Sequence, residues 1–368
     1  MSYNSFCYKL CLNSTLHRRE RTTMDVLRGF LLLQAISSIL CENGYFNGYY
    51  FGAASAMYFG MDHFKVPCYS FECCTVGGGK VHWIRNDVGK LESLLKEKLF
   101  GQHIANKILT RQLGAFLLDP RPEKPFVLHI SGKTGTGKNH ISNLIAQARY
   151  FKGEASNHVL KIIGTHKYST LDADKARVLL KEEVSEHVKK CKHALVIIDE
   201  SEKLPEGTLN AISPFLDKNV AIDGVDYRNT IFILLSNTAG NAIKMFTDAQ
   251  LEKGRNRDDI TVLEMENLIQ EHLYNSGELK HSSLISRYQL DAFIPLLPLE
   301  RRHVQQCAEE QLNQRRYKCG CETSACVSTR ANEIANQIDF SGRFSRSGCK
   351  KILTKANLVC PLDRKIEL

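Results

Sequence analysis

The chain has 368 residues and an ordinary globular composition, with 43% hydrophobic and 24% charged residues. This length allows one large α/β domain and a smaller companion, and the lack of low-complexity tracts or repeats excludes fibrous and solenoid proteins. The net charge of +9 is compatible with a nucleic-acid or anionic-membrane partner. However, basic residues are scattered among acidic ones, which argues against a dedicated nucleic-acid face.

The first apolar run has the build of a secretory signal peptide. Residues 1–23 are polar and basic, and the charged lead 24–28 then precedes the apolar run 29–40. This pattern fits a signal best if translation starts at Met24, which makes 1–23 an upstream extension. The site near Cys41 lacks clear small residues for cleavage, and a buried helix is the alternative interpretation. We assign residues 1–43 to the extension and signal.

A second segment, residues 44–60, carries no charge and is rich in aromatic residues, Gly and Ala. Its length is at the short limit for crossing a hydrocarbon core, and its tyrosines suit a membrane interface. We therefore interpret it as membrane-associated and group it with the following cysteines into an N-terminal segment, residues 44–96.

The chain contains 13 cysteines. Some of these cysteines form two local groups, and neither group has the paired C-x2-C spacing of a tetrahedral zinc site. This argues against a structural metal. Many cysteines without metal spacing fit an oxidising compartment, where disulfides persist. Cleavage near Cys41 would leave ten cysteines, an even number. The two local groups are Cys68, Cys73 and Cys74, and Cys319, Cys321 and Cys326.

From about residue 97 the sequence alternates between short apolar runs and helical spacing, which predicts an α/β fold with a parallel sheet covered by helices on both faces. Beyond about residue 300 strand signals stop, and residues 300–316 predict an amphipathic helix followed by others. We expect an α/β domain at 97–298 and a small helical domain at 299–368. The predicted strands are 126–130, 159–163, 194–198 and 230–235, and the predicted helices are 138–150, 172–190 and 207–216.

A glycine-rich loop directly follows the first predicted strand and opens a predicted helix, which is the context that a P-loop requires. Its glycines let backbone N–H groups turn inward on phosphates, and the helix N-terminus adds a positive dipole. We expect Lys138 to reach the β- and γ-phosphates of ATP. The loop residues expected to bind the nucleotide are Gly132, Lys133, Thr134, Gly135, Thr136, Gly137, Lys138 and Asn139.

Asn139 stands where P-loops normally place Ser or Thr, whose hydroxyl binds Mg²⁺. Its amide oxygen can still meet the ion or a metal-bound water, but more weakly. A nucleotide-binding protein without catalysis is the alternative that this residue leaves open.

Carboxylates follow the third predicted strand, and an amide follows the fourth. We expect Asp199 to bind Mg²⁺ through water and Glu200 to polarise the attacking water, which favours hydrolysis over a slow switch. Solvated turn residues are the structural alternative for this pair. Asn237 is expected to position the lytic water, although a strand-end Asn is more often a turn former.

The order of P-loop, Asp-Glu pair, strand-end Asn and helical lid is similar to that of the AAA+ ATPases. More narrowly, the chain resembles the torsins, AAA+ ATPases of the endoplasmic reticulum lumen and nuclear envelope. The resemblance covers about residues 66–355, and the Asn after the P-loop lysine and the Gly-Cys-Lys near the C-terminus are its most specific features. The segments that carry it are 135–139, 100–103, 214–217, 281–285, 295–300 and 348–350.

The resemblance implies a role for each site residue. Lys138 would bind phosphate, Asp199 would belong to the Mg²⁺ shell, and Glu200 would be the hydrolytic base. Asn237 matches the sensor-1 residue of the family. Lys350 matches the sensor-2 residue, a cation that reaches the nucleotide from the lid.

The resemblance also implies two disulfides, Cys307–Cys349 and Cys74–Cys191, with buried free thiols as the alternative. A bond at Cys349, next to Lys350, would link the redox state to nucleotide contact.

The resemblance implies a Mg²⁺-dependent ATP hydrolase that remodels proteins or complexes in the endoplasmic reticulum lumen and perinuclear space. It implies a homo-oligomer, membrane association through the N-terminal segment, and a membrane-anchored activator that supplies an arginine in trans. Such an arginine is worth ~10³–10⁵ in rate. Arg287 lies roughly where other AAA+ proteins keep theirs, and a surface or interface arginine is the simpler explanation.

Two other functions remain as alternatives. A nucleotide-gated binding module would hold ATP with negligible hydrolysis. A DNA-handling AAA+ protein would require a cytosolic or nuclear location, and we expect no nucleic-acid partner. The C-terminal residues 365–368 are similar to a K-D-E-L retrieval signal, with Ile366 in place of the acid.

Overall fold

The computed structural model describes residues 72, 74, 76, 82–276, 279, 282–314 and 320–360. The predicted signal, the segment 44–60 and the C-terminal residues 365–368 lie outside these residues. Within the described part of the chain, no helix has both the length and the apolar character needed to span a bilayer. Contacts divide the chain into the units Met1–Cys73 and Cys74–Leu368, and all described helices and strands belong to the second.

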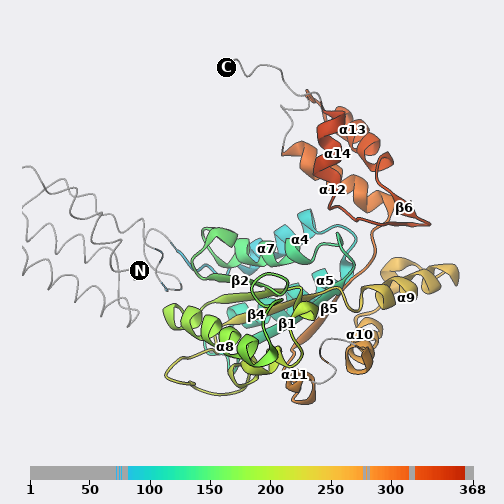
Figure 1. Ribbon diagram of the computed structural model, residues 1–368. Coiled ribbons are helices and arrows are strands. Elements are labelled where there is room, and N and C mark those ends of the chain that lie inside the picture. Colours follow the sequence, from blue (N-terminus) through green and yellow to red (C-terminus); the bar gives the residue numbers. More distant parts are fainter. Residues whose placement is uncertain are drawn as a thin grey trace, which may run out of the picture. The chain divides into compact units, whose positions relative to one another are not determined.

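A five-stranded parallel sheet lies at the centre of this unit, in the order β2-β3-β4-β1-β5 (Figure 1). Because both faces of such a sheet are covered, its strands read as continuous apolar runs rather than as alternating patterns. The sequence predicts this parallel sheet and four of its strands, β1 to β4. The strands are β1 (Phe126–Gly132), β2 (Val159–Ile163), β3 (Leu195–Asp199), β4 (Ile231–Ser236) and β5 (Ala292–Leu296).

The strand β5 is the one member of this sheet that the apolar pattern does not predict. It contains Pro295, which cannot donate a backbone hydrogen bond. The proline is tolerated because β5 is an edge strand and pairs only with β1.

Helices cover both faces of the sheet. α4 and α7 pack together on one face, and α8 packs with η5 on the other (Figure 1). The predicted helix at 207–216 is η5, which is a 3-10 helix and contains Pro214. The helical elements are α4 (Val88–Lys98), α5 (His103–Ile108), the π-helix η2 (Leu109–Leu113), α6 (Gly114–Leu118), α7 (Lys138–Arg149), η3 (Gly153–Ala155), α8 (Ala173–Lys190), η4 (Ser201–Lys203), η5 (Thr208–Leu216), α9 (Gly240–Glu252), η6 (Arg257–Asp259), α10 (Val262–Ser276) and α11 (Ser283–Ser286).

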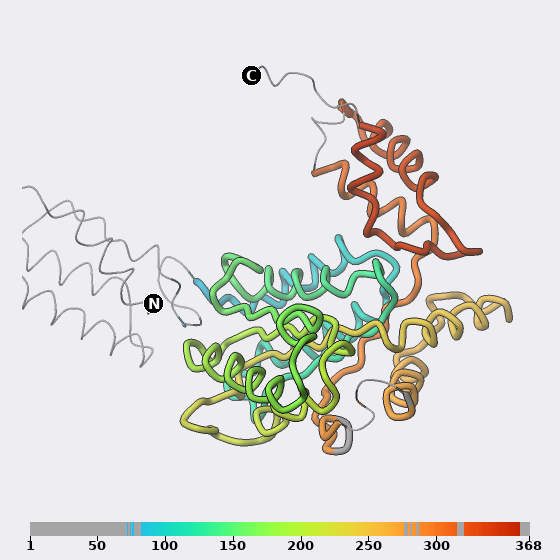
Figure 2. The backbone as a smooth tube through the Cα atoms, viewed as in Figure 1, coloured from blue at the N-terminus to red at the C-terminus, as the bar shows by residue number. Residues whose placement is uncertain are grey.

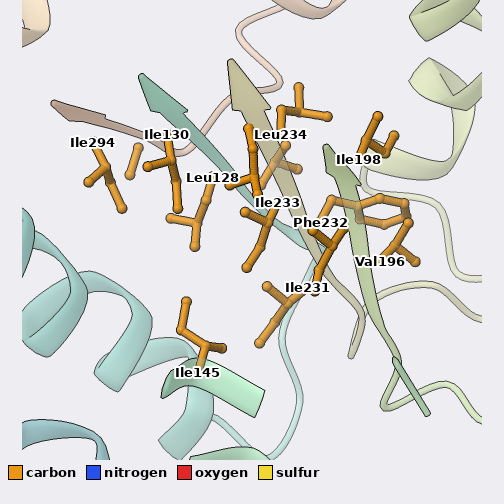
Figure 3. Packing of buried hydrophobic residues seen from close by; sticks show 14 of the residues in the cluster. Leu128, Ile130, Ile145, Val196, Ile198, Ile231, Phe232, Ile233, Leu234 and Ile294 are labelled. Atoms are coloured by element: carbon orange, nitrogen blue, oxygen red, sulfur yellow. The ribbon is translucent and has the colours of Figure 1, made fainter. Parts of the chain in front are cut away.

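Side chains of neighbouring strands fill the core between the sheet and these helices. Ile145 reaches toward the sheet from α7 (Figure 3). Each fully buried Ile or Leu contributes about 1.5–3 kcal/mol relative to exposure, so the strand ends are held firmly. Four strands contribute the buried residues Ile294, Ile130, Leu234 and Ile198 (Figure 3).

Residues after β5 form a second hydrophobic cluster, which starts at Leu299. Three helices pack against one another around it, and Figure 2 traces this part of the chain in orange to red. They are α12 (Arg301–Asn313), α13 (Ser324–Asn336) and α14 (Ile352–Val359).

The expectation that strands stop at residue 300 is wrong. The antiparallel strands β6 (Phe340–Ser341) and β7 (Phe344–Ser345) form a small hairpin between α13 and α14. Gly342 turns this hairpin with a left-handed φ of +62°. Strands of two residues are too short to produce an apolar period, so no sequence pattern predicts them.

His303 in α12 is buried and neutral. It forms a capping box with Glu300, whose backbone N–H donates to His303 Nδ1 at 3.2 Å. Burial lowers the pKa of His303 to about 3, and the charges of Arg257 and Arg302 act in the same direction.

We expect this histidine to destabilise the fold in acid. Because its folded pKa lies below the ordinary 6.5, only the unfolded chain takes up the proton between pH 6.5 and pH 3, so stability falls as the pH falls through this window. The loss at pH 5 is about 2 kcal/mol for this group. His303→Gln keeps a capping-box side chain but does not titrate.

Urea unfolding of both proteins at pH 7.5 and pH 5 checks this expectation. The unfolding free energy of His303→Gln should fall by about 2 kcal/mol less than that of the parent over this interval. Equal losses in the two proteins would contradict it.

Candidate functional site

The carboxyl ends of β1, β3 and β4 place the predicted site residues at one edge of the sheet. Register pairs Ser131 with Ser236 and aligns Asp199 with Leu235. The glycine-rich loop therefore leaves β1 next to the Asn that follows β4, and the Asp-Glu pair lies at the end of β3, one strand further along the sheet. In open α/β sheets, ligands bind in the crevice outside such strand ends.

The loop turns from β1 into α7 through two glycines with left-handed φ, Gly135 at +83° and Gly137 at +117°. At Gly132 a Cβ atom would lie 2.7 Å from Thr136 Oγ1, so the turn is too tight for a side chain. Gly137 is the N-cap of α7, and no side chain caps this helix end. Its first N–H groups thus suit an anion such as phosphate.

The ammonium group of Lys138 lies within the curve of this loop. It donates to the carbonyl oxygens of Gly132 at 2.7 Å and Lys133 at 3.2 Å, and to Asn237 Oδ1 at 2.7 Å. Burial lowers the pKa of Lys138 to about 8; nearby carboxylates, led by Glu202, raise it, whereas the charge of Lys350 lowers it. A bound phosphate would add negative charge here and keep the ammonium group protonated.

Asn237 is held from a second side by Glu202, a residue that the sequence analysis did not single out. Asn237 Nδ2 donates to Glu202 Oε1 at 2.7 Å. Among the described residues, the other carboxylate oxygen of Glu202 is buried without a hydrogen-bond partner. Glu202 lies in the short helix η4, where the sequence suggests only a turn, so no local signal marks it.

Glu200 has an unusual backbone conformation, with φ at +56°. Its carboxylate accepts a hydrogen bond from Thr165 Oγ1 at 2.5 Å. A Cβ atom on Gly164 would lie 2.4 Å from the Glu200 carbonyl oxygen, so the chain after β2 lies directly against this residue. Non-glycine residues rarely adopt this conformation, and strained residues of this kind cluster at functional sites. Thr165 is also absent from the predicted site, because 35 residues separate it from its partner.

Asp199 and Asn139 direct oxygen atoms at one cation. Lys161 Nζ lies 3.3 Å from Asp199 Oδ2 and 3.4 Å from Asn139 Oδ1. Oxygen atoms are the ligands that Mg²⁺ prefers. Because a positive group already lies between these two oxygens, the residues present fit the expected ion.

The C-terminal part of the chain touches the loop through glycine. The Cys349 N–H donates to the Gly135 carbonyl oxygen at 3.1 Å. A Cβ atom on Gly135 would lie 1.8 Å from the Ser347 carbonyl oxygen, and one on Gly348 would lie 2.1 Å from the Gly135 carbonyl oxygen. Only residues without a side chain allow this approach, which brings Lys350 near Lys138.

Three disulfides join pairs of described cysteines: Cys74–Cys191, Cys307–Cys349 and Cys321–Cys326. The first two are the pairs that the resemblance implies, and the third was not predicted. The Cys307–Cys349 bond connects α12 to the segment that lies on the loop.

Gln102 connects the loop to the chain after β5. It exchanges two hydrogen bonds with the backbone of Leu297, at 2.8 and 2.9 Å, and donates to the Thr136 carbonyl oxygen at 3.2 Å. Arg287, by contrast, follows α11 with an exposed side chain.

Known proteins are similar to this chain both in sequence and in fold. A family model described as Torsin matches residues 68–198. The structure of the Saccharomyces cerevisiae Hsp104–ADP complex matches 73% of this chain and 45% of that chain, with a TM-score of 0.53 and 14% identity. A closed-state structure of Hsp104 with ATPγS and casein gives a TM-score of 0.52 at 16% identity. At such low identities these likenesses show the AAA+ fold alone.

Sequence relatives cover most of the chain. A Torsin-like protein of Caenorhabditis elegans is 34% identical over 298 residues, which are 80% of this chain and 82% of the relative. A Torsin-like protein of Drosophila melanogaster is 32% identical over 310 residues, 83% of this chain and 89% of the relative. Identity at this level over this length goes with a shared fold and a common family. The chain is a member of the torsin family of AAA+ ATPases.

Proposed function

We propose that this protein binds ATP with Mg²⁺ and hydrolyses it. The observation that carries the proposal is the shared edge of the sheet. Lys138 in the loop and Asn237 after β4 are in direct contact at 2.7 Å, Asp199 ends β3, the strand between β4 and β2, and Glu200 directly follows it. Phosphoryl transfer depends almost entirely on positioning and charge stabilisation, and these residues offer both.

Each residue has a distinct task in this proposal. Lys138 neutralises charge on the β- and γ-phosphates, and Asn139 and Asp199 supply oxygen atoms to the metal shell. Bound Mg²⁺ would offset negative charge on the phosphate oxygens. Glu200 polarises the attacking water once its carboxylate leaves Thr165, and Asn237 orients that water.

We further propose that the cycle remodels proteins or complexes in the endoplasmic reticulum lumen and perinuclear space. The protein would act as a homo-oligomer, with the hydrophobic segment 44–60 associated with the membrane and a membrane-anchored activator supplying an arginine. Family membership supports this assignment, and disulfides suit that compartment. We propose an α/β domain at 97–298 and a lid at 299–368. The hydrophobic clusters that end at Leu297 and start at Leu299 support the boundary between these two domains, whereas the first cluster already begins at Ile84.

A nucleotide-gated binding module is the second candidate. Two observations favour it: Asn139 replaces the usual hydroxyl ligand, and Thr165 engages the carboxylate of Glu200 at 2.5 Å. Hydrolysis would then stay negligible, and ATP would only hold a partner-competent conformation.

Glu200→Gln separates these candidates. Removing the base should lower ATP hydrolysis by about 10²–10⁴-fold while nucleotide affinity stays near that of the parent. The assay measures phosphate release with and without the lumenal domain of an activator, and Glu182→Gln on the exposed face of α8 is the matched control. A Glu200→Gln protein that turns over ATP like the parent would refute the assigned base. A parent rate at background in both conditions would favour the module.

Reducing Cys307–Cys349 should weaken nucleotide binding. The bond restrains the segment that places Lys350 near the loop, so its loss should lower affinity by roughly 5-fold or more. Binding of a fluorescent ADP is measured with and without reductant. Cys307→Ser should bind like the reduced parent and ignore reductant, whereas the double variant Cys321→Ser/Cys326→Ser should keep the parent's response. A parent affinity that reductant leaves unchanged would remove this link.

A further inference from the structure

A lysine occupies the position where the two metal-binding oxygens converge. Lys161 is the one charged residue in β2, whose sequence is otherwise Val-Leu-Ile-Ile. Its ammonium group lies 3.3 Å from Asp199, the last residue of β3, and 3.4 Å from Asn139. These two oxygens come from different elements, β3 and α7, so their common partner is set by the fold and not by local sequence.

This lysine and a divalent ion compete for the same oxygens. Mg²⁺ binds oxygen ligands at 2.0–2.1 Å and demands a near-octahedral shell. An ammonium group between Asp199 and Asn139 lies where that shell would form, and two cations repel each other there. The Lys161 side chain is 42% exposed, whereas that of Asp199 is 13% exposed, so the lysine can move toward solvent and the carboxylate stays.

The charge balance gives the lysine a second effect. Asp199, Glu200 and Glu202 all lie close enough to Lys138 to raise its pKa, so the nucleotide phosphates must approach three carboxylates. Without a metal ion, Lys161 is the cation that pairs with Asp199 and reduces its repulsion of phosphate. Once the metal ion is bound, that task no longer falls to the lysine.

We propose that Lys161 is a tethered cation that takes over part of the role of Mg²⁺ at this nucleotide site. It supports nucleotide binding when the metal is absent and leaves Asp199 when the metal binds. The lysine thereby weakens the coupling between Mg²⁺ and nucleotide. This inference rests on the proposed nucleotide site and concerns how strongly that site depends on the metal.

The test measures the dissociation constant of a fluorescent ADP in excess EDTA and in saturating Mg²⁺. The quantity compared between variants is the ratio of the EDTA value to the Mg²⁺ value. Lys161→Met removes the charge and keeps the length of the side chain. We expect its ratio to exceed that of the parent by about 5-fold, mainly through weaker binding in EDTA. Lys161→Arg keeps the charge and should give a ratio near that of the parent.

Lys167→Met is the matched control, because Lys167 follows the same strand and pairs with Glu183 at 2.5 Å, away from the metal oxygens. Its ratio should equal that of the parent. If Lys161→Met binds ADP with the parent's ratio or a smaller one, the inference is overturned while the proposed function stands. If the parent itself binds no ADP in Mg²⁺, the proposed function fails, and the inference fails with it.

Discussion

Five parallel strands end at the same edge of the sheet, and the groups proposed for nucleotide chemistry lie at that edge. The register of β1 with β4 and of β4 with β3 brings Gly132, Asp199 and Asn237 together, although about 105 residues of chain connect the first to the last. A shift of one residue in any of these strands would move each side chain to the opposite face of the sheet, away from its packing partners, and would displace the site residues as well. The buried core of the sheet therefore sets the precision of the site.

Charged and polar groups of the proposed nucleotide site are paired within the protein. Lys138 binds loop carbonyls and Asn237, Glu200 accepts from Thr165, and Asp199 faces Lys161. In the proposed function, each of these contacts engages a group that nucleotide, water or metal would engage. Nucleotide binding would then exchange protein partners for ligand partners, and this exchange would reduce the net gain from any single contact.

The second constraint is the contact between two glycine backbones, Gly135 in the loop and Gly348 in the C-terminal segment. A Cβ atom at either position would overlap the backbone of the facing segment. The C-terminal segment therefore reaches the glycine-rich loop only because both residues lack a Cβ atom. The Cys307–Cys349 disulfide restrains the same segment. The position of Lys350 therefore depends on backbone packing and on a covalent bond together.

The sequence by itself determined the α/β architecture, the P-loop and the order in which the carboxylates and the amide follow it, because apolar runs and glycine spacing are local properties. It missed β5 and the β6–β7 hairpin, where a proline or very short strands hide the period. The tertiary structure alone brought Thr165, Glu202 and Lys161 to the predicted residues. Their partners lie 22 to 38 residues away, and only strand pairing, which no local pattern encodes, makes them neighbours.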